Sequence, residues 1–378
     1  MKIFVSAGET SGDAILGAVL QRLRARHQEM ELCGLGGPMA QACGLLPLFP
    51  LEKTAVNGGW DVLRHALFLL RMYRHSVAAL IGFHPDLVIL VDYPGLNLRL
   101  AQKARALGIP IYFLAPPQTW VYRKAKHRKA RVARALAGCS VHVLFPFEAE
   151  TFAKTARRVT VGHFMITNQV VRQQTTVSRP ILCLCPGSRM PVLVRNLPVW
   201  LDHLNGLGIF GVEENSMEPK VQILVPEHLG TQVTFWLDEF RQGRYAHLVP
   251  IRTDKDSALA QADRVIAFPG TITLELARLR VPTLVLAILD PFTLVVGKRI
   301  LKSPRLALPN LLLGEGVFPE WAGTATNLTV TRFRGLLENL LTWNPSWELF
   351  ANRLETVVGL GSGAEIVAEE CLELLGLN

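Results

Sequence analysis

Acidic side chains that could move a proton are concentrated in two short turn-like segments of the sequence. Residues 7–13 read AGETSGD and contain Glu9 and Asp13, and residues 91–97 read VDYPGLN and contain Asp92. Each segment follows a short apolar run, as a turn does at the end of a parallel strand, where α/β proteins bind ligands. A carboxylate there can act as a general base toward a hydroxyl group. We therefore predict Asp92 as the base, with Glu9 and Asp13 as alternatives.

Small residues in the first of these segments suit contact with an anion. Ser11 and Gly12 let the backbone approach a ligand closely, and amide groups at the start of a following helix favour negative charge. A tight turn capped by Ser11 or Asp13 is the structural alternative, and Asn97 is the helix-cap candidate of the second segment. The glycine cluster GLGGP at residues 34–38 lacks the full dinucleotide fingerprint and fits a turn with positive φ equally well.

Two glycine-containing turns in the second half of the chain combine backbone amides, hydroxyl groups and charge. One ends an apolar run as PGSR at residues 186–189, and the other opens a helix-like run as GTITLE at residues 270–275. The arginine can bind a phosphate through two parallel hydrogen bonds, and the Gly-Thr amides suit a diphosphate. The glutamate can accept hydrogen bonds from ribose, although a capping threonine with a glutamate inside the helix is the structural alternative. The predicted nucleotide-binding residues are Gly187, Ser188, Arg189, Gly270, Thr271 and Glu275.

A dense basic segment follows two aromatic residues. Seven Lys or Arg lie between residues 123 and 134, directly after Trp120 and Tyr122. Cations beside aromatic residues suit phosphate groups or an anionic membrane surface. Nucleic acid is a competing partner for such a patch, and a solvated helix face is the structural alternative. The predicted acceptor- or phosphate-binding residues are Ser11, Gly12, Trp120, Arg123, Lys124 and Arg128.

The elements that position these residues follow from alternating short apolar runs and longer amphipathic runs. In the first half we expect strands at residues 3–5, 32–34, 87–91, 111–114 and 141–144, with helices at 12–27, 62–83 and 97–107. In the second half we expect strands at 181–185, 221–225, 264–267 and 283–286, with helices near 232–241 and 273–280 and a closing helix near 364–375. Both halves are therefore predicted to be parallel sheets wrapped by helices.

The predicted fold class is α/β with two Rossmann-like domains. Residues 173–180 read as a linker. We expect an N-terminal domain over residues 1–170, a second domain over residues 181–360, and a helix over residues 361–378 that joins the first domain. Parallel sheets that face each other across an interdomain cleft make up the GT-B architecture, in which ligands bind between the domains.

Composition narrows the function classes further. A formal net charge of +9 favours acidic partners, and six cysteines without a CxxC pair argue against a zinc ribbon or a disulfide framework. The apolar stretch at residues 62–83 carries three Arg and two His, which is too many for a spanning helix. The first residues, MKIFV, lack the apolar region of a signal peptide. We expect a cytoplasmic protein that contacts a membrane surface.

Taken in order, the motifs resemble those of the lipid-A-disaccharide synthase family over nearly the whole chain up to about residue 320. The matching strings are AGETSGD at 7–13, Trp120 with its basic continuation, FPFE at 145–148, VGH at 161–163, PGSR at 186–189, GTITLE at 270–275, PFT at 291–293 and LPNLL at 308–312. Departures occur at Gly95, Thr167 and Val192, where the family usually has an acid, and at Pro269, where it usually has a serine.

The resemblance implies a metal-independent, inverting glycosyltransferase that needs no cofactor. Its substrates would be UDP-activated 2,3-diacylglucosamine and 2,3-diacylglucosamine 1-phosphate, and its place the cytoplasmic face of the inner membrane. Arg189 and the amides of Gly270 and Thr271 would hold the diphosphate, Glu275 the ribose, and Asn310 the nucleotide. The basic residues after Trp120 would meet the acceptor phosphate. We expect no nucleic-acid partner, and a homodimer is an open alternative.

Two other functions remain as alternatives at this point. Another GT-B enzyme acting on UDP-N-acetylglucosamine, such as a 2-epimerase or an undecaprenyl-linked transferase, would share the diphosphate turn and the ribose acid. A catalytically weakened lipid- or nucleotide-binding relative would fit the departures at Thr167, Val192 and Pro269. The AGETSGD string and the Trp-basic segment favour the disaccharide synthase.

Overall fold

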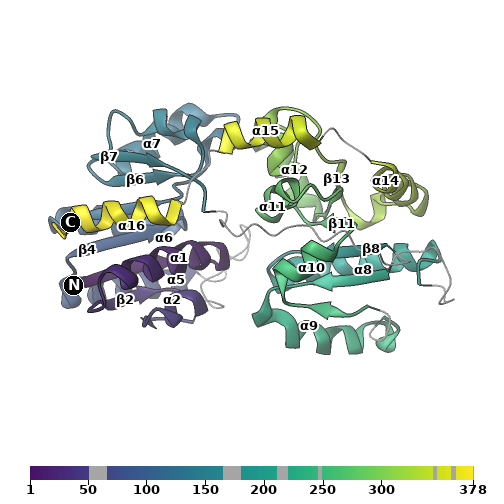
Figure 1. The fold of residues 1–378 in the computed structure, drawn as a ribbon, viewed down its shortest axis with the longest axis horizontal. Coiled ribbons are helices and arrows are strands. Elements are labelled where there is room, and N and C mark those ends of the chain that lie inside the picture. The colour runs from purple at the N-terminus through teal and green to yellow at the C-terminus, as the bar shows by residue number, and fades with distance from the viewer. Residues whose placement is uncertain are drawn as a thin grey trace. The chain divides into compact units, whose positions relative to one another are not determined.

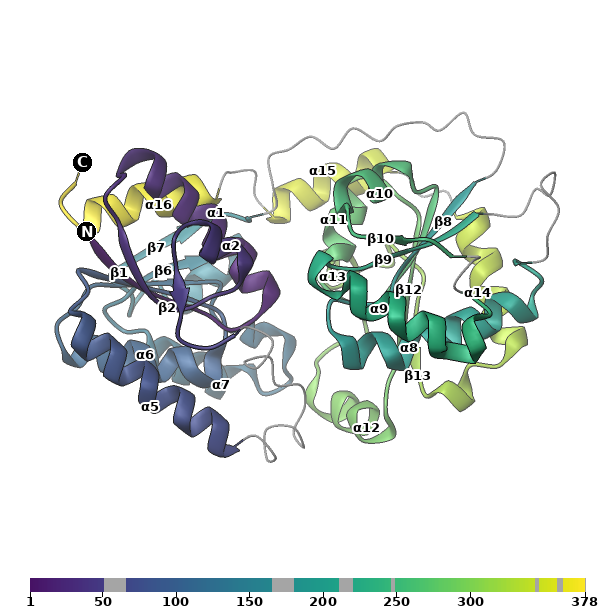
Figure 2. The same ribbon diagram turned by 90° about the horizontal axis from the view of Figure 1, so that it is seen from below.

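The computed structural model describes residues 1–50, 66–164, 180–210, 220–245, 249–343, 347–358 and 363–377. The chain divides into two compact units, one of residues 1–167 with 356–378 and one of residues 168–355. Each unit is a parallel sheet flanked by helices (Figures 1 and 2), so the predicted α/β fold class is confirmed. The expected linker at 173–179, the helix start at 62–65 and Thr167 lie outside the described residues.

The first unit contains a seven-stranded parallel sheet in the order β3-β2-β1-β4-β5-β6-β7. Its strands are β1 Lys2–Ala7, β2 Glu31–Leu35, β3 Leu46–Pro47, β4 Leu87–Val91, β5 Ile111–Leu114, β6 Ser140–Val143 and β7 Arg158–Val161. Strand order reverses between β1 and β4, which pair directly, Ala7 opposite Val91. In doubly wound sheets such a reversal marks the edge where ligands bind. The two acid-bearing turns follow these two strands.

Helices cover both faces of this sheet. They are α1 Thr10–Arg26, α2 Pro38–Ala42, α5 Ala66–Phe83, α6 Pro94–Ala106, α7 Ala125–Ala135 and α16 Gly363–Leu374, with 3₁₀ turns η1 Thr119–Val121 and η2 Pro146–Thr151. Alternate strand residues divide the core, because Ile3 and Val5 pack with α1 and α16 whereas Phe4 packs with α5, α6 and α7. Figure 2 shows these two layers on opposite sides of the sheet. An Arg22–Glu365 ion pair of 2.9 Å links α1 to α16.

The second unit contains a six-stranded parallel sheet in the order β10-β9-β8-β11-β12-β13. Its strands are β8 Ile181–Cys185, β9 Lys220–Leu224, β10 Ile251–Arg252, β11 Arg264–Ala267, β12 Thr283–Ile288 and β13 Glu320–Gly323. Its helices are α8 Met190–Gly206, α9 Glu227–Glu239, α10 Lys255–Gln261, α11 Ile272–Arg278, α12 Pro291–Ile300, α13 Leu308–Leu313 and α14 Val330–Thr342, with 3₁₀ turns η3 Phe240–Gly243 and η4 Ala325–Asn327. Helix α15, Trp347–Val358, contains the boundary between the units.

Candidate active site

The turns after β1 and β4 are packed together through Gly8 and Tyr93. A Cβ atom at Gly8 would lie 2.4 Å from Tyr93 Cγ, so only glycine leaves room for the ring. Burial raises the pKa of Tyr93 to about 12, and the negative charge of Glu9 adds to the rise. The turns that contain Glu9 and Asp92 therefore lie side by side at one edge of the sheet.

Asp92 is held in an uncommon backbone conformation. Asp92 and Tyr93 have φ values of 44° and 49°, in the left-handed region that non-glycine residues rarely adopt. Two such residues in succession are stable only where surrounding contacts enforce them, and such strain is concentrated at functional sites. The Asp92 side chain is partly exposed, at the carboxyl end of the completely buried strand β4.

Asn97 supplies the contacts that fix this turn. Its Nδ2 donates to the backbone oxygens of Ser6, Val91 and Asp92 at 3.1, 3.0 and 2.9 Å. Its Oδ1 accepts from Ser6 Oγ at 2.6 Å. The expectation that Asn97 caps the following helix is wrong, because α6 begins at Pro94 and Asn97 lies inside its first turn. Its buried amide instead ties the ends of β1 and β4 to each other.

Asp13 lies in the first turn of α1 and points toward α2. Its buried carboxylate accepts hydrogen bonds from the backbone N–H groups of Gly37, Met39 and Ala40 at 2.7, 2.9 and 3.2 Å. These N–H groups lie at the start of α2, where backbone donors have no hydrogen-bond partner within the helix. The geometry gives Asp13 the role of a cap for α2, with both carboxylate oxygens engaged by backbone donors.

The glycines of the GLGGP segment, which lies next to Asp13, are required by the conformation and close contacts of the backbone. Gly34 has a φ of 136°, and a Cβ there would lie 1.9 Å from Val5 O. Gly37 is the residue before the first turn of α2. The GLGGP segment is thus a strand-to-helix turn with close backbone contacts. Of the two small residues in the first motif, Ser11 is exposed and Gly12 is buried against Val91.

Trp120 and the basic helix α7 form a second group in the same unit. Trp120 Nε1 donates to Glu148 Oε1 at 2.9 Å, and the Phe145 N–H donates to Glu148 Oε2 at 3.1 Å. Burial raises the pKa of Glu148, while the hydrogen bond from Trp120 opposes that rise. Phe147, which packs edge-on against Trp120, remains exposed. The role of Glu148 as the anchor of Trp120 is not visible in the sequence, because the two residues are 28 positions apart.

The cations of this group lie at the surface. Arg123, Lys124 and Arg128 are exposed, and the Arg128 guanidinium lies 4.2 Å from the centre of the Tyr122 ring. Cations on aromatic rings are favourable, and here the contact orients Arg128 beside the aromatic cluster. The predicted association of basic and aromatic residues is therefore present at this surface.

In the second unit, the turn after β8 brings Gly187, Ser188 and Arg189 to the start of α8. Gly187 has a φ of 117°, which favours glycine, and a Cβ there would lie 3.0 Å from Val192 Cγ1. Arg189 is the residue before the first turn of the 17-residue helix α8. Val192, at the position of a departure from the family pattern, is therefore packed against the glycine of the turn.

The turn after β11 places Gly270 and Thr271 before α11. Thr273 Oγ1 donates to Gly270 O at 2.8 Å and accepts from the Leu308 N–H at 3.2 Å. Glu275, inside α11, forms an ion pair with Lys255 Nζ at 2.9 Å. Sequence reasoning missed Lys255, because it lies 20 residues away on another helix.

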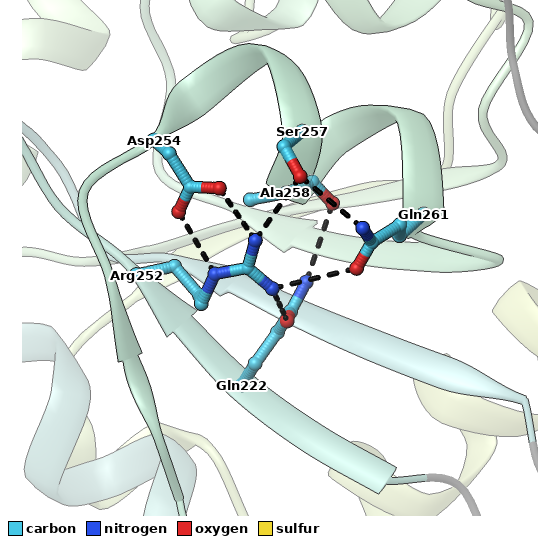
Figure 3. Close-up of polar contacts among 6 residues, drawn as sticks. All are labelled: Gln222, Arg252, Asp254, Ser257, Ala258 and Gln261. Carbon is cyan, nitrogen blue, oxygen red and sulfur yellow. Dashed lines mark hydrogen bonds and ion pairs between the residues drawn. The ribbon is translucent and has the colours of Figure 1, made fainter.

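A polar network fixes the segment that carries Lys255 (Figure 3). The Arg252 guanidinium donates to Asp254 Oδ1 at 2.8 Å, which lowers the pKa of Asp254 to about 2. Further hydrogen bonds connect β9, β10 and α10 through Gln222, Arg252, Ser257, Ala258 and Gln261. The start of α10, and with it the position of Lys255 beside Glu275, is held by this network.

The side chain of Asn310, the residue predicted to contact the nucleotide, is engaged within the protein. It is buried, its Nδ2 donates to Phe318 O at 2.8 Å, and its Oδ1 accepts from the N–H groups of Val317 and Phe318 at 2.7 and 2.9 Å. The amide is engaged by the loop before β13. This geometry gives Asn310 a structural role in that loop.

Two doubly wound units of this kind define a class of protein. The fold is similar to that of a spinosyn rhamnosyltransferase (TM-score 0.61, 12% identity, 98% of this chain and 99% of that one). It is also similar to a UDP-GlcNAc 2-epimerase from Neisseria meningitidis (TM-score 0.57, 13% identity, 99% and 100%). The predicted GT-B class is confirmed by these likenesses, which at such identities concern the fold alone.

Sequence comparison identifies the family within this class. The family model described as lipid-A-disaccharide synthetase matches residues 3–342. A lipid-A-disaccharide synthase of Alkalilimnicola ehrlichii is 31% identical over 88% of this chain and 89% of its own length. One of Pseudomonas fluorescens is 33% identical over 85% and 84%. The chain belongs to the lipid-A-disaccharide synthetase family, and the predictions of that resemblance and of a glycosyltransferase are confirmed.

Two further observations bear on the surroundings of the site. Within the described part of the chain, no helix is long and apolar enough to cross a membrane. Among the same residues, no group of His, Cys, Asp and Glu side chains could hold a metal ion.

Proposed function

We propose that the protein transfers 2,3-diacylglucosamine from its UDP-activated form to 2,3-diacylglucosamine 1-phosphate, with release of UDP and inversion at the anomeric carbon. The observation that carries this proposal is the family match over residues 3–342, together with relatives named lipid-A-disaccharide synthase. The epimerase alternative is supported only by likeness of fold.

In the proposed reaction an acceptor hydroxyl oxygen attacks the anomeric carbon while the bond to the UDP phosphate oxygen breaks. Asp92 takes the hydroxyl proton, because it is a partly exposed carboxylate at the switch point between β1 and β4. The strained turn and Asn97 hold it in place, which is the preorganisation that a catalytic group needs. Glu9 is the alternative base, and we assign Asp13 to support of α2 instead.

Donor binding is assigned to the second unit. Arg189 and the amides that follow Gly187 at the start of α8 supply positive charge and dipole for the diphosphate that leaves as UDP. Ser188, Gly270 and Thr271 are proposed as further contacts. Glu275 is proposed to accept from ribose hydroxyls, in an orientation fixed by its ion pair with Lys255. No nucleotide contact is assigned to the Asn310 side chain.

Acceptor binding and membrane association are assigned to the first unit. The exposed cations Arg123, Lys124 and Arg128 suit an acceptor phosphate or anionic lipid. On the same face of the sheet, Leu67 and Leu70 of α5 are 84% and 43% exposed. Apolar side chains beside cations are the combination found at membrane interfaces. We propose peripheral association with the cytoplasmic face of the inner membrane.

The proposal is tested by product analysis. Purified protein is mixed with both acylated substrates, and the lipid extract is examined by mass spectrometry for the disaccharide 1-phosphate. Reactions without acceptor and reactions with Arg189→Ala are the controls. We expect one disaccharide per UDP released, and markedly less with the variant. UDP formation without disaccharide would reject transfer to this acceptor.

A further inference from the structure

Helix α12, Pro291–Ile300, is unusual among the helices of the second unit. None of its ten described residues is buried, although five of them are Phe, Leu, Val or Ile. Figure 2 shows the helix at the margin of the unit. A surface helix normally buries its apolar stripe against the core. The outward apolar residues of α12 therefore require another partner.

The exposed apolar side chains of α12 share one face. Phe292 is 60% exposed, Val295 is 53% exposed and Ile300 is 38% exposed. Val295 and Ile300 lie three and eight residues after Phe292, so they flank it at roughly 60° and 80° on a helix with 3.6 residues per turn, and the three residues span about 140° of its surface. Leu294 and Lys298, four residues apart, lie on another side and line a pocket, and Lys298 is also exposed.

Charge indicates what this face meets. Residues 291–313 contain four cations and no Asp or Glu. The cations Lys298, Arg299 and Lys302 are exposed. Phe235 on α9 is also exposed, at 68%, but α9 carries the acids Glu227, Asp238 and Glu239. The acid at the N-cap, Asp290, is engaged by Arg195 and by the Thr293 N–H, and the other charges of α12 are cations. An apolar face beside these cations suits an anionic bilayer, whereas the acids of α9 oppose one.

The pocket beside α12 fits a phosphate group at such a surface. It has a volume of about 450 Å³ and lies between α12, the end of β13, η4 and the start of α14. Lys298 and Arg332 line it together with Trp321. Over the described ranges, neither cation forms an ion pair with an acidic side chain. Two cations beside an aromatic ring are the combination with which membrane-bound proteins contact lipid headgroups.

We propose that α12 is a membrane-contacting helix of the second unit. Its Phe292 face enters the interface of an anionic bilayer, and the pocket with Lys298 and Arg332 binds a lipid phosphate. This contact is separate from the α5 and α7 surface of the first unit. It rests on α12 and the pocket beside it and does not depend on the transfer reaction. Membrane contact from this unit would keep the donor-binding half at the bilayer surface.

The test measures co-sedimentation of the full chain with vesicles of phosphatidylcholine, with and without phosphatidylglycerol, and with no substrate present. Phe292→Ser is compared with Phe235→Ser, which removes a similarly exposed phenylalanine from the acidic helix. We expect Phe292→Ser to weaken binding to the anionic vesicles by about 10-fold, since burial of one such side chain is worth roughly that factor. Phe235→Ser should bind as the unchanged protein does.

Two further arms separate the alternatives. Val295→Ser with Ile300→Ser should repeat the loss, and Lys298→Gln should reduce binding to anionic vesicles but not to neutral ones. Sedimentation velocity detects a self-association face, and UDP release from detergent-dispersed substrates reports the transfer reaction separately. Equal vesicle binding by Phe292→Ser and Phe235→Ser would overturn the proposal. So would a loss of self-association, or a raised KM for the acylated donor, with vesicle binding unchanged.

Discussion

The ring of Tyr93 lies directly over the backbone of Gly8, so closely that a Cβ at Gly8 would be 2.4 Å from Tyr93 Cγ. Gly8→Ala must therefore displace the ring and the adjoining turn of Asp92. We expect a loss of about 1–3 kcal/mol in the free energy of unfolding, as for other overpacked sites, and a lower kcat. Denaturant unfolding and UDP release measure these effects.

Gly95→Ala is the matched control for that substitution. It lies in the first turn of α6, three residues after Asp92, and a Cβ there meets nothing within 4 Å. Its unfolding free energy should remain within about 0.5 kcal/mol of the unchanged protein, as for most surface substitutions. Equal effects of the two alanines would show that the Gly8–Tyr93 contact does not constrain the turn.

Asn97→Ala tests whether the strained turn positions Asp92. The substitution removes the amide that bonds to the backbone oxygens of Ser6, Val91 and Asp92. We expect kcat to fall while KM for the UDP-sugar changes little, and stability to fall by roughly 1–3 kcal/mol because buried polar groups lose partners. Ser6→Ala removes only the hydroxyl that donates to Asn97 Oδ1 and leaves the three bonds from Nδ2 in place, so it should give a smaller loss. An unchanged kcat would place Asn97 outside the catalytic function.

Asp13→Asn separates a structural acid from a catalytic one. The amide keeps one acceptor oxygen but presents an NH₂ group to backbone donors at the start of α2, so the free energy of unfolding should fall by roughly 1–3 kcal/mol. The folded fraction should keep a kcat within a few-fold of the unchanged protein. A 100-fold drop in kcat without loss of stability would instead indicate that Asp13 acts as the general base.

His142 makes the first unit sensitive to acid. It is buried, with Nε2 donating to Gly162 O and Nδ1 accepting from Thr160 Oγ1, both at 2.8 Å, and burial lowers its pKa from 6.5 to about 4. A lowered histidine pKa contributes stability above the unfolded value of 6.5. That contribution is lost as pH falls toward 4, by roughly 3 kcal/mol in total. His142→Gln should flatten this slope in denaturant unfolding between pH 7 and pH 4.5, and equal slopes would contradict the assignment.

The inner strands of both sheets were predictable because buried parallel strands are apolar runs bounded by turns, whereas the edge strands β7 and β13 were not predicted. Residues 87–91, 111–114, 181–185 and 264–267 begin and end as expected. Helix α8 was not predicted, since Pro198 interrupts its pattern. The edge strands β3 and β10 have two residues each, too few to show alternation.

The candidate site was predictable in its residue types but not in its partners. Asp13 bonds to backbone 24 to 27 residues away, and Asn97 bonds to Ser6 across 91 residues. Nothing in the local sequence distinguishes such supporting side chains from catalytic ones. The Asp92 turn itself was found because its acid follows an apolar strand. Its strained backbone became visible only in the folded chain.

Asp92→Asn gives the most direct test of the proposed reaction. UDP release is measured with the acylated UDP-glucosamine donor and acylated glucosamine 1-phosphate, beside the non-acylated UDP-glucosamine donor. We expect the unchanged protein to release UDP efficiently only with the acylated pair. Asp92→Asn should lower kcat by about 10²–10⁴-fold, the usual contribution of a positioned base, and leave UDP affinity in calorimetry nearly intact. Equal turnover of both donors, or a variant with kcat within a few-fold of the unchanged protein, would contradict the account.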